Sequence, residues 1–498
     1  MIRFATLRGP LTLAALLSIS TAVAAPPAPA PADRAGWLAD FDTLIQALER
    51  RSANLAWSAS PASGVDVPAL YRRARRHLAE ARDAGEARDA IRQFVAGFRD
   101  GHMSALPWLA ASPGHETPEP PAAGLDPSDP AAGCASLGLA STANGAFSLP
   151  FETLPGFRLI ADGLAQPFRT GTLPLGEGRL LAVIRIAHFS AAAFPATCLE
   201  AWADMRAHGR AITAEAVREA AEHRWFADLA GRLQVLRSRG ASALIVDIGN
   251  NSGGNDMGDW TARLFSAGPV RSAPLLVTAS EEGRAYLDEQ IAVIEDALKS
   301  AGDRPGEAAI LTEALQAFRA RRDAASRLTC DRSWVWHEQR AWDPSGCSGL
   351  VEAGYASGPL RALPAGPLTD TAAQALYWPV RVAPLAGAWT GSTFVLTDDR
   401  TYSSAEMFAA TMRDNGLARI VGQRSGGDGC GFMASPTPLV LPHIRLRFRI
   451  PNCVRLRADG SDEVAGVQPD IEVAPTEGES ARARALRLVM EIERAGPG

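Results

Sequence analysis

The sequence predicts an α/β fold in which helices pack on a parallel, layered sheet. Residues 244–248 form an apolar run typical of a buried strand, and they follow residues 192–239, which have the composition of one or two helices. Residues 393–396 are β-branched, aromatic and apolar, and they lead through a short corner into residues 406–412, which hold helix formers and no glycine or proline. Such alternation of helix and strand is typical of a layered α/β core.

The N-terminus has the pattern of a secretory signal. In residues 1–24, Arg3 and Arg8 precede an apolar run, and small residues follow at the expected cleavage site. Residues 25–35 are a Pro/Ala-rich spacer. No later stretch reaches about 18 uninterrupted apolar residues, so we expect no stable membrane span. The mature chain is therefore expected to be periplasmic or secreted.

Composition limits the partners and the cofactors. The formal net charge is -5 without a basic run, so nucleic acid is not expected to bind. No cysteine or histidine spacing typical of a metal site occurs, and we expect no metal and no cofactor. Six cysteines in an exported chain favour disulfides. Short sequence separations predict Cys330–Cys347 and Cys430–Cys453, which leaves Cys134–Cys198 by elimination.

The first domain is expected to be helical and to span residues 36–116. Its apolar residues recur at helical spacing, as at positions 87, 91, 94, 95 and 98. Gly101 is a natural helix C-cap, so His102 is expected to begin the next segment, clear of the helix. Residues 117–130 are rich in proline and are interpreted as a linker.

The catalytic core is expected in two parts, residues 131–280 and 380–498, separated by an insertion. Residues 180–186 are the clearest strand of the first part, and a closing helix is expected at 480–494 in the second. The insertion, residues 281–379, begins with two helical stretches, 286–299 and 307–325, and continues with a segment rich in Trp, Gly and Pro. Its tryptophans are interpreted either as a lid over a substrate groove or as a satellite core: Trp334, Trp336, Trp342 and Trp378.

Two turns carry the candidate chemistry. Ser403 stands where the strand at 393–396 meets the next helix, and a serine there faces free backbone N–H groups that can stabilise an oxyanion. An ordinary N-cap serine is the alternative. The glycine turn at 250–254 could contribute the N–H of Gly253 or Gly254, with the N–H of Ser404 as the second oxyanion donor. A plain βα turn is the alternative there.

Four motifs, in this order, resemble those of the C-terminal processing peptidase superfamily, which includes the tail-specific proteases, the tricorn core protease and the chlamydial secreted protease. The motifs are DIGNNSGG at 247–254, SSAE at 403–406, VGQRSGG at 421–427 and EVAGVQPD at 463–470. The resemblance implies a crotonase-like core of stacked ββα units and a serine nucleophile, Ser403. The chain departs from the family at Gly249, where the relatives have arginine, and we find no peptide-binding PDZ domain.

The base that activates Ser403 depends on the branch of the family. In the tail-specific branch a lysine stands in a Gly-Lys-Gly turn, but here Asp428 occupies that position, and the only lysine is Lys299 in the helical insertion. The non-lysine branch has its catalytic histidine in a D-x-H motif, which matches residues 100–102. The resemblance therefore implies that His102 is the base and that Glu463 orients it, with the adjacent Asp462 as a rival for the third role.

These observations predict an exported serine endopeptidase that cleaves peptide or protein substrates through an acyl-enzyme. A catalytically silent peptide-binding protein with the same fold is one alternative, and Gly249 and the Asp428 turn favour it. An esterase or acyl transferase on the same site is the other, and it would need a closed pocket in place of an open groove. The sequence leaves the oligomeric state undetermined.

Overall fold

The computed structural model describes residues 33–108, 125–142, 145–164, 167–344, 346–366, 368–434 and 436–496. The predicted signal segment (1–24) and residues 25–32 of the spacer lie outside the described residues, as do residues 117–124 of the linker. The signal and linker interpretations therefore stay predictions.

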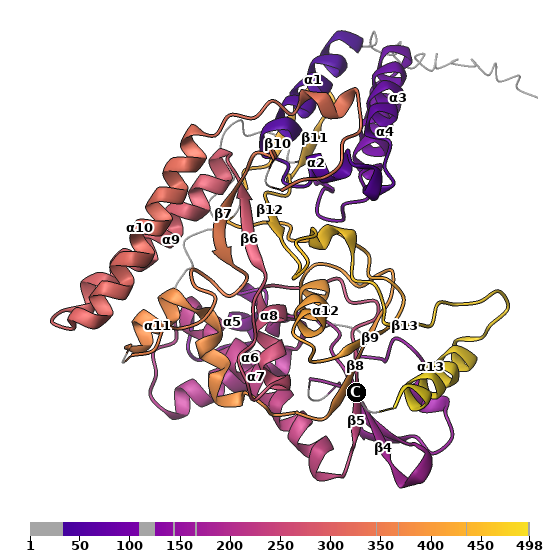
Figure 1. Cartoon of the computed structure of the whole chain (residues 1–498), viewed down its shortest axis with the longest axis vertical. Helices are drawn as coiled ribbons and strands as arrows, with labels where there is room; N and C mark the ends of the chain where they lie inside the picture. The colour runs from indigo at the N-terminus through magenta and orange to yellow at the C-terminus, as the bar shows by residue number, and fades with distance from the viewer. Residues whose placement is uncertain are drawn as a thin grey trace, which may run out of the picture.

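A mixed seven-stranded sheet forms the centre of the described chain, in the order β13-β9-β8-β5-β4-β3-β2 (Figure 1). In this sheet β4, β5, β8, β9 and β13 run parallel to one another, and β2 and β3 form an antiparallel edge. The central strands are mostly apolar and buried, as expected for strands with helices on both faces. The strands are β2 (Arg158–Ala161), β3 (Thr170–Pro174), β4 (Leu180–Arg185), β5 (Ala243–Asp247), β8 (Ser392–Thr397), β9 (Arg419–Gly422) and β13 (Ile471–Glu472). The predicted α/β fold is confirmed.

Helices form a layer on each side of this sheet. One face carries α6 (Pro195–Ala207), α7 (Ala214–Ser238), α8 (Met257–Thr261) and α12 (Ser404–Asp414), whose Trp202, Trp225 and Phe408 join Ile184 and Val246 in one core. The other face is covered by α13 (Ala481–Ala495), the predicted closing helix, which packs on Leu181, Ile245 and Phe394. The short helix α5 (Pro130–Ser136) lies beside α6.

The N-terminal region is helical, as expected, and packs against the end of the chain. It contains α1 (Arg34–Arg51), α2 (Leu55–Ser58), α3 (Val67–Glu80) and α4 (Ala84–Ala96). Their apolar faces enclose Phe41 and Phe94 together with Leu441 and Phe448 of the hairpin β10 (Leu439–Leu441) and β11 (Leu446–Phe448). Strand β1 (Ala105–Leu106), three residues after His102, pairs with β11. This pairing carries the predicted base toward the C-terminal part of the core.

The region interpreted as an insertion contains an antiparallel pair of long helices, α9 (Glu281–Ala301) and α10 (Pro305–Arg327), which include the two predicted helical stretches. Figure 1 shows this pair as an arm that projects away from α12. The attached end of this arm packs on a second sheet, whose strand order is β12-β6-β7. Its strands are β12 (Cys453–Arg455), β6 (Pro274–Thr278) and β7 (Leu350–Tyr355). Helix α11 (Asp370–Leu376) packs beside α9.

Short 3-10 turns complete the described elements. They are Pro61–Ser63, Phe151–Thr153, Gly176–Gly178, Ala191–Ala193, Ala262–Phe265, Ser333–Trp336, Trp378–Leu385 and Glu463–Ala465. Trp336, in one of them, is 3% exposed within the N-terminal core and donates its Nε1–H to Glu49 Oε1 at 2.7 Å. Trp334 packs on the same cluster, and Trp378 packs against the central core. The core interpretation therefore fits Trp336 and the half-buried Trp334, whereas the half-buried Trp378 also lines a cavity.

Three disulfides form the predicted pairs, Cys134–Cys198, Cys330–Cys347 and Cys430–Cys453. The first joins α5 to α6, the second closes the segment after α10, and the third ties β12 to the segment that follows β9. Within the part of the chain that the structure describes, no helix has the length and apolar content needed to cross a bilayer.

Candidate active site

Ser403 stands at the corner between β8 and α12, and its hydroxyl is directed at a histidine. The residue occupies the N-cap position of α12, but its side chain accepts no hydrogen bond from the helix. Its Oγ instead lies 3.2 Å from His102 Nε2, although the two residues are 301 positions apart. The Ser403 side chain therefore does not cap the helix. Its contact with His102 is the one that a nucleophile and its base require.

His102 is fixed by the turn that follows α4. Arg99 adopts a positive φ of 59°, and Asp100 Oδ1 accepts the His102 backbone N–H at 3.0 Å. On the far side of the ring, Gly431 has a φ of 77°, and a side-chain carbon there would lie 2.7 Å from the imidazole. The Phe432 ring contacts the imidazole edge-on. The imidazole is thus held on both faces, with Nε2 toward Ser403.

Three oxygen atoms surround His102 Nδ1. The Asp428 carbonyl lies 3.1 Å away, and carboxylate oxygens of Asp428 and Asp100 lie at 3.5 and 3.6 Å. Burial disfavours the charged imidazolium, but the hydrogen bonding and negative charge of Asp100 and Asp428 outweigh it and raise the pKa of His102 above its usual value. The site is therefore built to stabilise a protonated histidine.

The predicted oxyanion donors divide into occupied and available N–H groups. The N–H of Gly253 is donated to Asn251 Oδ1 at 2.8 Å. Within the described chain, the N–H groups of Gly254 and Ser404 have no acceptor. Gly253 lies directly against Ser403, because a side-chain carbon at Gly253 would be 2.6 Å from Ser403 Cβ. The pair that remains available to an oxyanion is Gly254 and Ser404.

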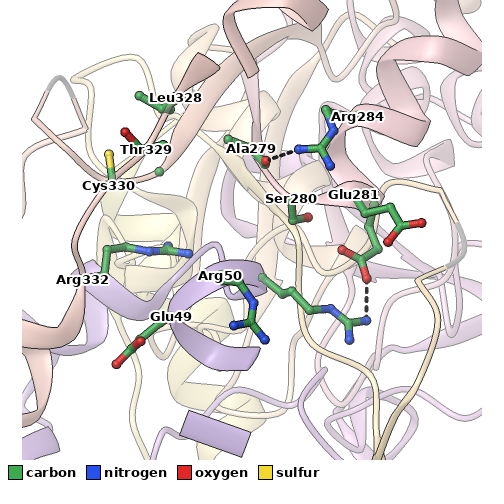
Figure 2. Close-up of a pocket in the computed structure, with 13 residues that line it drawn as sticks. Glu49, Arg50, Ala279, Ser280, Glu281, Arg284, Leu328, Thr329, Cys330 and Arg332 are labelled. Atoms are coloured by element: carbon green, nitrogen blue, oxygen red, sulfur yellow. Dashed lines mark hydrogen bonds and ion pairs between the residues drawn. The ribbon is translucent and has the colours of Figure 1, made fainter. Parts of the chain in front are cut away.

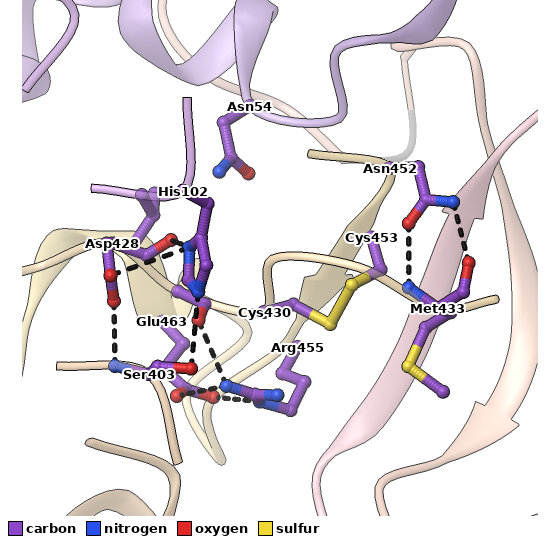
Figure 3. The surroundings of a disulfide bond; sticks show 12 residues. Asn54, His102, Ser403, Asp428, Cys430, Met433, Asn452, Cys453, Arg455 and Glu463 are labelled. Atoms are coloured by element: carbon purple, nitrogen blue, oxygen red, sulfur yellow. Dashed lines mark hydrogen bonds and ion pairs between the residues drawn. A yellow bond between two sulfur atoms is a disulfide. The ribbon is translucent and has the colours of Figure 1, made fainter. Parts of the chain in front are cut away.

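Glu463 lies at the site but is bound by an arginine. Both of its oxygens accept from Arg455, at 2.6 and 2.9 Å, and its side chain is 1% exposed. Asp462 Oδ1 accepts the N–H of Val464, and burial raises the pKa of Asp462 to about 7. Among the described contacts, neither carboxyl group is bonded to His102. The carboxylates that face its ring are Asp100 and Asp428, and Figure 3 shows Asp428 beside the ring.

Sequence reasoning assigned no role to Glu406, the last residue of the SSAE motif, and the structure gives it one. Its buried carboxyl accepts from Ser425 Oγ and from the N–H groups of Gly427, Asp428 and Gly429. The turn that carries Asp428 is therefore built onto the first turn of α12. The position of Asp428 in the lysine-branch turn was the signal that this residue would lie near Ser403.

The structure also accounts for two departures from the family pattern, the glycine at position 249 and the absence of a lysine from the site. A side-chain carbon at Gly249 would lie 2.6 Å from Ser148 Oγ, so the turn has no room for an arginine. The buried Asp247 is instead paired with Arg185 of β4, whose Nη1 lies 3.2 Å from Oδ1. Lys299 lies in α9, 74% exposed and paired with Asp296. The lysine is thus on the arm and outside the site.

The match to a family model decides the membership of the chain. Residues 181–473, more than half of the sequence, match the model of peptidase family S41. The chain belongs to peptidase family S41. This S41 peptidase contains the four motifs that suggested the processing peptidases, and it is a serine peptidase.

Solved structures extend the likeness to the whole fold. The crystal structure of mature CPAF has a TM-score of 0.51 at 13% identity and covers 93% of this chain and 97% of its own. Mature CPAF complexed with lactacystin gives 0.52 at 13% identity, covering 93% and 98%. A CPAF mutant gives 0.53 at 14% identity, covering 93% and 97%. At these identities the likeness concerns the fold. No curated protein sequence matches the chain.

Two cavities are lined by residues of the glycine turn or next to it, and neither is lined by Ser403 or His102. One of about 310 Å³ is lined by His188, Asn250 and Ser252, and one of about 280 Å³ is lined by Asn255, Trp260 and Trp378. A larger cavity of about 590 Å³ lies between the end of α1 and the start of α9 (Figure 2), but none of the predicted site residues lines it. Among the described residues, no group of three or more His, Cys, Asp or Glu side chains could hold a metal ion.

Proposed function

We propose that this S41 peptidase is an exported endopeptidase that cleaves peptide or protein substrates through an acyl-enzyme on Ser403. The observation that carries the proposal is the 3.2 Å approach of His102 Nε2 to Ser403 Oγ. A catalytically silent binding protein would have no use for a histidine in this position, with a raised pKa and its Nε2 directed at a serine.

The arrangement supports the following steps. His102 Nε2 removes the Oγ proton as Oγ attacks the substrate carbonyl carbon, and the carbonyl oxygen becomes an oxyanion that accepts from the N–H groups of Ser404 and Gly254. The C–N bond then breaks as Nε2 returns the proton to the leaving amine. A water molecule, deprotonated by the same nitrogen, releases the acid product and restores Ser403.

Two further observations support the substrate class and the compartment. Asn250 and Asn255, at the two ends of the glycine turn, line separate cavities, and a polypeptide that continues in both directions from the cleaved bond needs space at more than one place beside the site. Three disulfides favour an oxidising compartment, which agrees with the predicted signal segment and with a periplasmic or secreted protein.

Labelling with a fluorophosphonate probe tests the proposal, together with hydrolysis of fluorescent casein. We expect the wild-type protein to be labelled and to cleave casein, and Ser403→Ala to do neither. Ser238→Ala is the matched control, because Ser238 is exposed near the end of α7 and should leave both activities unchanged. Wild-type protein without labelling would favour the silent binding protein. Labelling with ester hydrolysis but no peptide cleavage would favour an esterase.

A further inference from the structure

One residue touches both members of the Ser403–His102 pair. Asp428 Oδ1 accepts the backbone N–H of Ser403 at 2.7 Å, and the same residue presents its carbonyl and its carboxylate Oδ2 to His102 Nδ1 at 3.1 and 3.5 Å. We propose that Asp428 is the positioning carboxylate of the site, in the role expected for Glu463. This inference rests on the proposed Ser403–His102 mechanism.

The contacts of Asp428 fix the tautomer of His102. A carbonyl oxygen can only accept, so Nδ1 must carry the proton in the neutral ring to donate to the Asp428 carbonyl. Nε2 is then left with its lone pair toward Ser403 Oγ, which is the form a general base needs. The hydrogen bond from Ser403 N–H holds the nucleophile in register with the ring. A single residue therefore aligns both partners.

The negative charge of Asp428 stabilises His102 after it has taken the serine proton. When His102 takes the serine proton, the new imidazolium lies beside the carboxylates of Asp428 and Asp100, whose side chains are each 6% exposed. Charges at this separation interact strongly where water is largely excluded. Asp100 also accepts hydrogen bonds from Asn54 Nδ2, at 3.3 Å, and from the backbone N–H of His102. Asp428 is the carboxylate that contacts the nucleophile as well.

Glu406 holds the turn of Asp428 in place, because its carboxyl accepts hydrogen bonds from the N–H groups of Gly427, Asp428 and Gly429. The two carboxyl groups share a hydrogen bond. Burial and the nearby charge of Asp428 raise the pKa of Glu406 well above its usual value. Burial raises the pKa of Asp428 as well, but His102 and the hydrogen bond from Glu406 oppose that shift. Of the two, Glu406 therefore takes up a proton more readily than Asp428.

This arrangement also gives Glu463 a different task. Glu463 binds Arg455, and Arg455 Nη2 donates to the carbonyl of Gly429 at 3.1 Å, next to Asp428 (Figure 3). Gly429 has a φ of 66°, and a side-chain carbon there would meet the Val464 backbone at 3.2 Å, so the turn packs directly on the segment that follows Glu463. Glu463 supports the turn through Arg455, one contact removed from Asp428.

Asp428→Asn tests the proposal, because asparagine keeps an oxygen for the Ser403 N–H and removes the charge. We expect kcat on casein peptides to fall about 100-fold or more, with KM changed little. Activity needs neutral His102, and a carboxylate raises the pKa of an imidazole, so kcat/KM rises with pH through a pKa above about 6.5. Losing the Asp428 charge should move that rise to lower pH, while Asp100 remains. Asp89→Asn, exposed in α4, is the matched control.

Glu463→Gln decides between the two carboxylates. If Glu463→Gln moves the pH rise and Asp428→Asn leaves both kcat and the rise in place, the proposal is overturned. Nitrogen-15 NMR of the His102 ring in inactive Ser403→Ala protein gives a test that needs no Asp428 variant to fold. A proton on Nδ1 in the neutral ring is expected, and a proton on Nε2 would also overturn the proposal. Wild-type protein without fluorophosphonate labelling would instead remove the proposed function.

Discussion

At the scale of single residues, Ser403 combines a chemical role with an unfavourable backbone. Its φ of 54° and ψ of −122° lie where residues with a side chain are seldom found. Hydrogen bonds hold it there, from its own N–H to Asp428 and from the Met407 N–H to its carbonyl. The structure thus maintains the strain that directs Oγ away from α12 and toward His102.

This strain predicts that Ser403→Gly is more stable than Ser403→Ala. Alanine removes the hydroxyl and keeps the strained φ, whereas glycine adopts that φ freely. Relief of a strained residue is worth about 1–3 kcal/mol, and the greater freedom of glycine in the unfolded chain costs about 0.4–1 kcal/mol. We expect a net gain of about 1 kcal/mol in the free energy of unfolding, measured by urea denaturation of the two inactive variants. Equal midpoints would limit the strain at Ser403 to about 0.4–1 kcal/mol, the amount that the freedom of glycine costs, and a less stable Ser403→Gly would show that the backbone is unstrained.

The sequence singles out Ser403 and His102 as the proposed nucleophile and base but does not identify their carboxylate partner. The family motifs carry both choices, and the two side chains lie 3.2 Å apart in the structure. The third role depends on which oxygen faces Nδ1 in the folded chain. Asp428 and Glu463 are both acidic residues in or next to the family motifs, and only the folded chain distinguishes them, because Glu463 is bound by Arg455 whereas Asp428 contacts His102. A motif does not specify such a pairing.

At the scale of elements, the segment from Ser425 to Phe432 is the part on which the site depends most. It carries Asp428 and Gly431, and it is attached to α12 through Glu406 and to β12 through Cys430–Cys453. Arg455 of β12 binds the same turn through the Gly429 carbonyl. No regular helix or strand was expected here and none forms, so side-chain anchors replace backbone pairing.

We predict that removal of Cys430–Cys453 lowers activity more than removal of Cys330–Cys347. The two bridges close segments of similar length, with sequence separations of 23 and 17, and each should contribute about 3 kcal/mol to stability in the chain-entropy model. Only the first holds the Asp428 turn. Paired Cys→Ser variants should therefore show similar shifts in urea midpoint, and only the variant without Cys430–Cys453 should lose kcat on casein in excess of its unfolded fraction. Equal kcat values would show that the turn holds its shape without the bridge.

Element prediction succeeded where the signal was periodic and failed where pairing was remote. The stretches 286–299 and 307–325 lie within α9 and α10, and the apolar runs at 244–248 and 393–396 overlap β5 and β8. In contrast, the alternation of apolar and arginine side chains over residues 444–450 predicts one strand, but only Leu446–Phe448 forms a strand, paired with β10 and with the two-residue β1. Alternation indicates which face of a strand is buried, but it does not indicate a partner more than 300 residues away.

At the scale of the whole molecule, the site is assembled from three distant parts of the chain. His102 comes from the end of the N-terminal helices, Ser403 from the central sheet, and Asp428 from the segment beyond β9. The helices contribute a core shared with β10, β11 and Trp336, so the N-terminal region is fixed by residues from the end of the chain and from the insertion. Catalysis therefore depends on packing between these regions.

We expect the outer part of the α9–α10 arm to be dispensable for activity, and the rest of the insertion, within residues 281–379, to be needed for folding. Replacing residues 281–379 removes Trp336 and Val335 from the N-terminal core and β7 from the second sheet, so we expect that variant to lose its cooperative thermal transition. Replacing only residues 292–314 with a short Gly-Ser linker removes the outer turns of α9 and α10, which pack on each other and on α11. Glu307 accepts two hydrogen bonds from Thr369 there, so this variant should be less stable than the wild type. This shorter variant should fold and keep both ester hydrolysis and casein cleavage, because the arm projects away from α12 (Figure 1). Loss of casein cleavage with ester hydrolysis intact would instead show that the outer arm contacts protein substrates.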